Sequence, residues 1–251
     1  MIGHPEQAIF PFYSFLYADE SDIQRRAKFI YDFIPHRKAE ILEPNSGDGK
    51  LAIQLALLGA KVTALEKSLV LFSLALEKFR MNPAIRPQLS LLPIDLVEFD
   101  IEKKFDVIVL TNTLSYLTDD ALKLYLTKAR GLLNPGGILI LNSPQPTSLR
   151  QEQPLQELTK KVFGENKIRH FASSRKIRDD LYEIFFKIES EYYGQLIYST
   201  ESTQNLHIRN LSSLENMLAN NGFGILQKTA GWNMEVWTSD SPNMVLVSSL
   251  V

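Results

Sequence analysis

The stretch that most constrains this chain is residues 39–68, in which two short apolar runs flank a glycine-containing turn and a helical run. The first run, 40–42, leads into Glu43, and the second, 62–65, leads into Glu66. The pattern predicts a strand, a turn, a helix and a second strand. This order is typical of a nucleotide-binding unit, because glycines allow close approach of a ligand and the start of the helix presents unpaired N–H groups there.

The strand–helix order continues beyond this unit. Further buried strands are expected at 89–92, 105–110 and 138–141, with helices between them. Short connections of this kind favour a parallel, doubly wound sheet whose strand ends meet at one edge. Polar side chains follow four of these strands, and we expect them to converge on one crevice: Glu43, Glu66, Asp95 and Thr111.

Composition narrows the class of protein. The 251 residues fit one large α/β domain, or one domain with an insertion. The absence of cysteine excludes disulfides and thiolate chemistry, and the four histidines show no metal-ligand spacing, so no metal site is predicted. A net charge of −2 argues against nucleic-acid binding through overall positive charge. Without a leader-like start or a long apolar run, we expect a cytoplasmic protein.

The pattern changes after the fifth strand. Residues 143–154 hold three prolines and are expected to form a loop, and helices are predicted at 155–163 and 174–188. A β-hairpin is expected from 191–199 and 204–211, followed by a helix and two last strands. The predicted parts are a core with an N-terminal helical flap (1–142), a substrate-cap insertion (143–211) and a return to the core (212–251).

Two segments leave alternatives open. Residues 7–17 are rich in aromatic side chains, which either pack on the core or form a flap with Tyr13 or Tyr17 facing the ligand. Between Lys160 and Arg178 the chain has seven lysines and arginines and one acid. That segment is either a solvated surface or a lid whose cations bind an anionic group of a substrate.

The acids around the glycine turn bear on which nucleotide it binds. The stretch Gly47-Asp48-Gly49, with Ala52, fits a permissive dinucleotide pattern that often arises by chance. Glu43 and Asp48, however, lie where a pyrophosphate would be repelled. A nucleoside that has no phosphates and carries an ammonium and a sulfonium suits this turn better, and S-adenosylmethionine is such a ligand.

These residues resemble the motifs of the class I S-adenosylmethionine-dependent methyltransferases. The run from Glu43 to Gly49 is similar to the family motif acid-x-Gly-x-Gly-x-Gly, with Asn45 in place of the first glycine. Asparagine is the residue after glycine that best tolerates a left-handed backbone, so the turn is expected to survive. Glu66 matches the family's ribose-binding acid, and Asp95 with Leu96 matches its adenine-binding turn.

Other stretches extend the resemblance. Residues 105–113 are similar to the family's fourth motif, and residues 133–137 to the turn before its fifth strand. The resemblance implies a Rossmann-like, mostly parallel seven-stranded sheet with an antiparallel C-terminal strand, plus a helical and hairpin substrate cap. Residues expected at the cofactor are Tyr17, Glu43, Asn45, Gly47, Gly49, Glu66, Lys67, Asp95, Leu96 and Thr111. Substrate candidates are Tyr13, Tyr116, His170, Tyr193, Arg209 and Trp232.

The implied activity is methyl transfer from S-adenosylmethionine to a small-molecule acceptor by in-line displacement, leaving S-adenosylhomocysteine. The basic segment suggests an anionic acceptor. A general base is needed only for an acceptor that is protonated at neutral pH, and no residue is assigned to that role. Two alternatives remain, namely a methyltransferase with an RNA or protein acceptor and a non-catalytic nucleotide-binding module.

Overall fold

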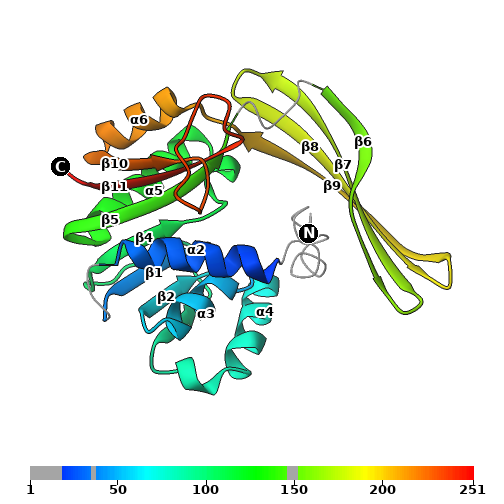
Figure 1. The fold of residues 1–251 in the computed structure, drawn as a ribbon, viewed down its shortest axis with the longest axis horizontal. Helices are drawn as coiled ribbons and strands as arrows, with labels where there is room; N and C mark the ends of the chain where they lie inside the picture. Colours follow the sequence, from blue (N-terminus) through cyan, green and yellow to red (C-terminus); the bar gives the residue numbers. More distant parts are fainter. Residues whose placement is uncertain (1–18, 35–37, 146–151) are drawn as a thin grey trace. The chain divides into compact units, whose positions relative to one another are not determined.

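The computed structural model describes residues 19–34, 38–145 and 152–251. They divide into two compact units. Residues 152–208 form the first, called here the four-stranded unit, and the remaining described residues form the second, called the core unit. Figure 1 shows that the core unit is a sheet with helices on both of its faces.

The core unit is built on a seven-stranded sheet with the strand order β10-β11-β5-β4-β1-β2-β3. Its strands are β1 (Glu40–Pro44), β2 (Lys61–Leu65), β3 (Leu89–Leu92), β4 (Phe105–Leu110), β5 (Leu133–Pro144), β10 (Phe223–Thr229) and β11 (Asn243–Leu250). The first five pair in parallel, and β11 runs antiparallel to both β5 and β10. The predicted mostly parallel seven-stranded sheet with an antiparallel C-terminal strand is therefore confirmed.

Helices connect these strands. They are α2 (Glu20–Asp32), α3 (Lys50–Leu57), α4 (Leu69–Arg80), α5 (Asp119–Leu132) and α6 (Leu211–Asn220), with the short 3₁₀ helices η2 (Pro83–Ile85) and η3 (Leu114–Tyr116). Several begin at a side-chain cap: Asp19, Ser68, Thr118 and Asn210 each accept a hydrogen bond from a backbone N–H in the first turn. Helix α3 differs, because its N-cap is Gly49, which has a left-handed backbone and no side chain to act as a cap.

Successive residues of the central strands face opposite helical layers. Ile41 and Val107 belong to an apolar cluster with side chains of α2 and α3. Leu42 and Ile108 belong to a second cluster, with side chains of α5 and α6. Because both faces of the sheet are covered, β4 is apolar along nearly its whole length, as expected of a central parallel strand.

The four-stranded unit is an antiparallel sheet in the order β6-β7-β8-β9. Its strands are β6 (Glu152–Phe163), β7 (Asn166–Arg178), β8 (Leu181–Tyr192) and β9 (Gln195–His207). The helices predicted at 155–163 and 174–188 are therefore wrong. The second of these spans the turn at Asp179-Asp180 and parts of two strands.

Two features of the sequence explain this error. In β8, Tyr182, Ile184 and Ile188 point inward at the period of two expected of a strand, yet apolar residues in the same stretch also satisfy helical spacing. Strand β6 lies at the edge of its sheet and is mostly exposed, so it shows no inward–outward alternation. Short apolar runs of this kind fit either periodicity until their pairing partners are known.

The predicted hairpin also has the wrong turn. We expected the chain to reverse at 200–203, but β9 runs straight through those residues. The reversal lies instead at Tyr193-Gly194, where φ is 48° and 75°. Positive φ at both central residues is the signature of the tight hairpin turns that match strand twist. Gly194 was the local signal for this turn.

Candidate functional site

The turn after β1 has an unusual backbone. Asn45, Gly47 and Gly49 have φ values of 55°, 60° and 75°, all in the left-handed region. A Cβ on Gly49 would lie 2.9 Å from the Cβ of Ala75 in α4, so no side chain fits there. These residues wind the chain tightly from the end of the strand to the start of α3, as the resemblance implied for Asn45.

Glu66 follows β2 and is fastened to this turn. Its Oε2 accepts the backbone N–H of Gly47 over 2.8 Å, and its Oε1 accepts that of Ser68, also over 2.8 Å. The side chain is 6% exposed. A carboxylate oxygen can accept two hydrogen bonds, so two donors do not by themselves saturate a carboxylate.

Two acids near the turn do not act as the sequence suggested. Burial, with the nearby charges of Asp48 and Glu66, raises the pKa of Glu43 to about 8, so this carboxyl is mostly neutral at pH 7. The Asp48 carboxylate pairs with Lys78 at 2.6 Å and with Lys50 at 3.2 Å. A mostly neutral Glu43 and a paired Asp48 would repel a pyrophosphate less strongly than the sequence suggested.

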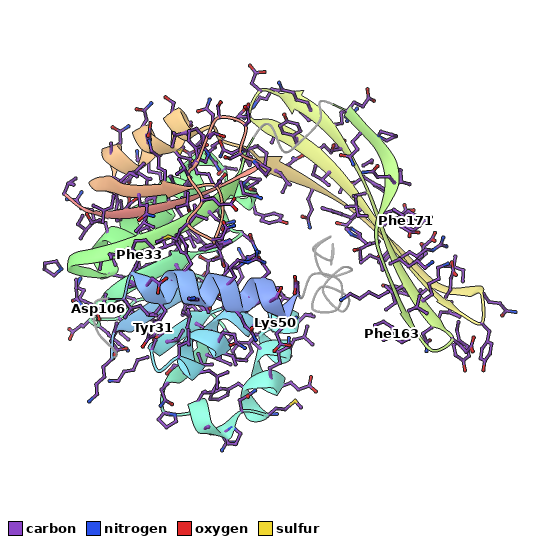
Figure 2. All side chains as sticks on the ribbon, viewed as in Figure 1. Tyr31, Phe33, Lys50, Asp106, Phe163 and Phe171 are labelled. Atoms are coloured by element: carbon purple, nitrogen blue, oxygen red, sulfur yellow. The ribbon has the colours of Figure 1, made fainter. Side chains whose placement is uncertain are left out.

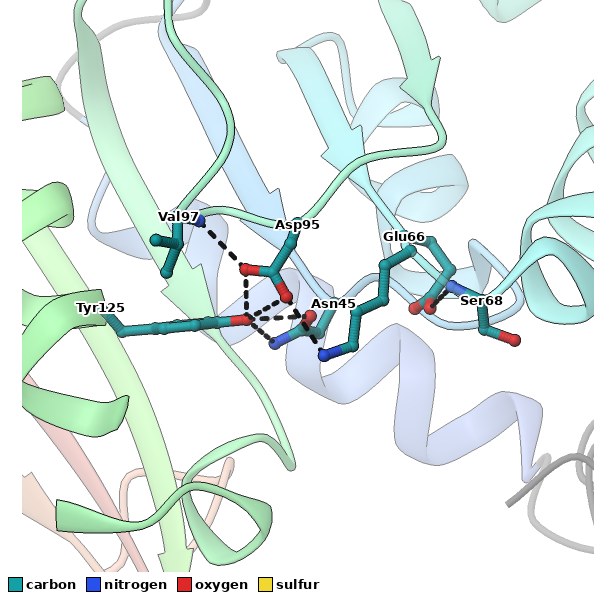
Figure 3. Close-up of polar contacts among 7 residues, drawn as sticks. Asn45, Glu66, Ser68, Asp95, Val97 and Tyr125 are labelled. Atoms are coloured by element: carbon teal, nitrogen blue, oxygen red, sulfur yellow. Dashed lines mark hydrogen bonds and ion pairs between the residues drawn. The ribbon is translucent and has the colours of Figure 1, made fainter. Parts of the chain in front are cut away.

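Asp95 lies in the turn after β3, on the same edge of the sheet. Its carboxylate accepts the hydroxyl of Tyr125 (3.0 and 3.1 Å) and the N–H of Val97 (3.0 Å), and pairs with Lys67 at 3.2 Å (Figure 3). Burial raises the pKa of Asp95, but these three partners outweigh burial and hold it below its usual value. The next residue, Leu96, is fully buried in the core.

Tyr125 was not among the site residues predicted from the sequence. It lies in α5, and its hydroxyl bonds both to Asp95 and to the Asn45 side chain, whose Nδ2 is 3.3 Å away (Figure 3). Burial, and then the neighbouring Asp95, raise the pKa of Tyr125, so it stays neutral. A tyrosine on an otherwise apolar helix face was the available signal, because a buried hydroxyl usually has a hydrogen-bond partner.

The segment after β4 is held by a pair of asparagines. Asn112 is left-handed at φ 53°. Its N–H donates to Oδ1 of Asn142 over 2.7 Å, and Nδ2 of Asn142 donates back to its Oδ1 over 3.1 Å. The adjacent Thr111 lies at the end of β4, where its carbonyl accepts the hydroxyl of Thr113. The segment after β4 is thus a further fixed turn at the same edge.

Arg209 is buried, and its guanidinium makes its contacts within the protein. Its side chain is 3% exposed and binds the carboxylate of Asp119 and the carbonyls of Leu114 and Leu117. These contacts fasten η3, the short helix that carries Tyr116. The Tyr116 side chain is exposed, so of these two substrate candidates it is the accessible one.

The other substrate candidates lie in different places. Trp232 packs edge-on against Phe29, with the guanidinium of Arg26 5.7 Å from its ring centre. His170 is fully buried in β7 and stacks on Phe186, and burial lowers its pKa. Tyr193 is exposed in the β8–β9 turn. Candidates Tyr13 and Tyr17 lie outside the described residues.

Most cations of the basic segment are paired across strands or turns. Arg169 pairs with Glu189 and Glu191 on β8 and lies over the ring of Phe171, a residue labelled in Figure 2. Arg175 pairs with Glu183. The pairs of the other cations are Lys167–Glu191, Lys176–Asp179 and Arg178–Asp180. The sequence between 160 and 178 did not reveal these acids, because they lie in the next strand or turn.

Within residues 19–34, 38–145 and 152–251, no three His, Cys, Asp or Glu side chains are grouped so as to hold a metal ion. In the same part of the chain, each helix is too short or too polar to cross a membrane.

Sequence comparisons identify the domain that contains the turn. Residues 41–137 match the family model of a methyltransferase domain. An uncharacterized methyltransferase of Bacillus mycoides (strain KBAB4) is 29% identical over 125 residues, which cover 47% of this chain and 56% of that protein. A protein of Bacillus thuringiensis (strain Al Hakam), described in the same way, matches to the same extent. The chain spans little more than half the length of these relatives.

Solved structures extend the similarity to the whole chain. The CcbJ methyltransferase from Streptomyces caelestis superposes with a TM-score of 0.83 at 19% identity, over 97% of this chain and 96% of that one. An S-adenosylmethionine-dependent methyltransferase from Clostridium acetobutylicum has a TM-score of 0.79 at 18% identity and covers 98% of both chains. The chain therefore contains a match to a methyltransferase domain at residues 41–137, and its fold is similar to that of S-adenosylmethionine-dependent methyltransferases.

Proposed function

We propose that the chain is an S-adenosylmethionine-dependent methyltransferase that acts on a small-molecule acceptor. The observation that carries this proposal is the position of Glu66, which follows β2 and whose carboxylate oxygens each accept one backbone N–H at the turn after β1. Two vicinal hydroxyls of a ribose are suitable donors for such a group. The domain match at residues 41–137 supports the same activity.

The neighbouring residues fit the remaining parts of this cofactor. Asp95 would offer the adenine a hydrogen-bond acceptor, and Leu96 would offer it an apolar neighbour. Asn45, Gly47 and Gly49 would hold the methionine part, because a Cβ on Gly47 would meet nothing within 4 Å and the backbone there is open to a ligand. Thr111, Lys67 and, outside the described residues, Tyr17 complete the proposed set.

The same turn is a poor binder of pyrophosphate. Dinucleotide sites offer free backbone N–H groups at the start of a helix to the phosphates. Here the N–H of Gly47 already donates to Glu66, and a phosphate beside that carboxylate would meet a negative charge. This arrangement favours a nucleoside without phosphates, and it replaces the weaker argument from Glu43 and Asp48.

The chain's contribution to catalysis is positioning. When bound, S-adenosylmethionine supplies a methyl group on a sulfonium that is already activated. The turns after β1, β2, β3 and β4 would hold it in one orientation and exclude water, and such positioning lowers a barrier by up to roughly 7–11 kcal/mol. No residue is proposed as a general base.

The acceptor is proposed from the relatives. The CalS10 structure, at 15% identity and a TM-score of 0.70, is described as an amino pentose methyltransferase, and KedS8 as a sugar N-methyltransferase. Amino sugars are therefore the first acceptors to screen. The anionic acceptor suggested by residues 160–178 stays a prediction, and the ion pairs of those cations weaken its support.

Calorimetry with the full chain tests the cofactor. S-adenosylmethionine and S-adenosylhomocysteine should each bind saturably at one site per chain, whereas NAD should give no heat beyond dilution. Saturable binding of NAD without binding of either sulfur compound would instead support a dinucleotide-binding module. A panel of amino sugars, RNA and protein acceptors with labelled cofactor then tests the acceptor class.

A further inference from the structure

Tyr125 is a polar-tipped residue on an apolar helix face. Its ring packs in the same cluster as Leu122, Leu126 and Ala129, and the side chain is 3% exposed. A phenylalanine would fill this space equally well. The hydroxyl therefore adds little to the packing, and its effect lies in the two residues it touches.

The hydrogen bonds of this hydroxyl run in one direction. A tyrosine has one proton to donate, and a carboxylate can only accept, so the proton goes to Asp95 at 3.0 Å. The amide of Asn45 then donates from Nδ2 to the tyrosine oxygen at 3.3 Å. Figure 3 shows the ring of Tyr125 ending between these two side chains. One hydroxyl thus joins the turn after β1 to the turn after β3.

We propose that Tyr125 is a positioning residue for the cofactor, which fixes the left-handed turn at Asn45 and the carboxylate of Asp95 in one arrangement. This inference rests on the proposed function, because both turns belong to the proposed cofactor site. Asn45 stands where the family motif has glycine, and its left-handed backbone costs more than that of glycine. The bond to Tyr125 offsets this cost, so the asparagine and the tyrosine work as a pair.

The test removes the hydroxyl and measures the two turns directly. The variant is Tyr125→Phe, and the matched control is Tyr31→Phe, which removes a hydroxyl from α2 in the same unit. In the free protein, amide hydrogen exchange of residues 45–49 and 95–97 should rise several-fold in the first variant and stay unchanged in the control. By calorimetry, S-adenosylmethionine should bind about tenfold more weakly to Tyr125→Phe, the loss expected for a hydrogen bond to a charged group.

A second background tests whether the effect runs through Asn45. Glycine adopts a left-handed φ without strain, so Asn45→Gly removes the need for the side-chain bond. In that background the added Tyr125→Phe change should weaken binding by about threefold at most, with the remainder acting through Asp95. Non-additivity of this size is what a coupled pair gives in a double-mutant cycle.

The outcomes separate the two ideas. If wild-type protein binds no S-adenosylmethionine, the proposed function fails, and hydrogen exchange still decides whether Tyr125 fixes the turns. Unchanged exchange and unchanged affinity in Tyr125→Phe would overturn the positioning role. If Tyr125→Phe weakens S-adenosylmethionine binding by the same factor in the wild type and in the Asn45→Gly background, the pairing of Asn45 with Tyr125 is overturned.

Discussion

The backbone N–H of Gly47 donates to Oε2 of Glu66 over 2.8 Å, which ties the turn after β1 to the end of β2 in the free protein. Ser46 strengthens the tie, because its N–H donates to the carbonyl of Leu65 over 2.9 Å. A ligand that binds this edge of the sheet meets a turn that is already formed. Such preorganisation lowers the entropy lost on binding.

Gly49 should not tolerate alanine. The substitution places a Cβ 2.9 Å from that of Ala75 and forces a non-glycine residue to φ 75°. We expect Gly49→Ala to lower the free energy of unfolding by about 2 kcal/mol or more. Urea denaturation measures this. The control is Gly131→Ala in α5, where a Cβ meets nothing within 4 Å, and it should be neutral or stabilising by about 0.5–1 kcal/mol. Equal stability of the two variants would contradict the steric argument.

Arg209 should be needed for stability. Replacing it by methionine removes the guanidinium donor of the Leu117 carbonyl and leaves the Leu114 carbonyl only the N–H of Leu117, and a buried polar group that loses its partner costs about 1–3 kcal/mol. We expect Arg209→Met to lower the free energy of unfolding by about 2–4 kcal/mol. Asp119→Asn should cost less than 1 kcal/mol, because that carboxylate is largely exposed. If thermal and urea unfolding show the same loss of free energy of unfolding for both variants, the hydrogen bonds to the two carbonyls do not account for the stabilising effect of Arg209.

Glu43 should give the stability a distinctive pH dependence. Its pKa is raised to about 8 in the folded protein from 4.5, so the folded state holds a proton that the unfolded state releases between these pH values. The contribution of Glu43 to the free energy of unfolding is fully present below pH 4.5. As the pH rises, it falls by up to about 1.4 kcal/mol per pH unit until about pH 8.

The variant Glu43→Gln has no titrating group at this position. Its comparison with the wild type therefore isolates the contribution of Glu43 to the pH dependence of stability. Its free energy of unfolding should decline less between pH 5 and 8 than that of the wild type, as measured by urea titrations at several pH values. Parallel curves for the two proteins would mean that Glu43 is charged in the folded state, which contradicts the burial argument.

The cations of residues 160–178 should matter little to turnover. We expect simultaneous replacement of Lys160, Lys161, Arg175 and Lys176 by glutamine to change KM for the acceptor less than about twofold, because pairs such as Arg175–Glu183 belong to the sheet surface. Steady-state kinetics at low salt provides the measurement. A rise of tenfold or more, confined to acceptors that carry a carboxylate or phosphate, would instead support the lid.

The core sheet could be predicted from sequence, whereas the four-stranded unit could not. Strands such as β4 are apolar along most of their length and are bounded by turns. They can therefore be assigned without knowing which strands they pair with. In β8, by contrast, apolar residues fit both periods, and only pairing with β7 and β9 decides between them.

The same limit applies to the site. The positions of Glu66 and Asp95 at one edge of the sheet could be predicted, because both residues follow strands and parallel strands end at one edge. The role of Tyr125 depends on a hydrogen bond to a residue 80 positions away in the sequence, and the charge of Asp48 is balanced by Lys78 from another helix. Long-range contacts of this kind leave little trace in local patterns.

The most direct test of the account is the affinity of Glu66→Ala for S-adenosylmethionine, measured by calorimetry beside Glu98→Ala, a change at an exposed acid near Asp95. Loss of two charge-assisted hydrogen bonds to a ribose should weaken binding by about 100-fold or more and take it out of the measurable range, while Glu98→Ala should bind as the wild type does. Unchanged affinity in a folded Glu66→Ala protein would contradict the assignment of this edge of the sheet as the cofactor site.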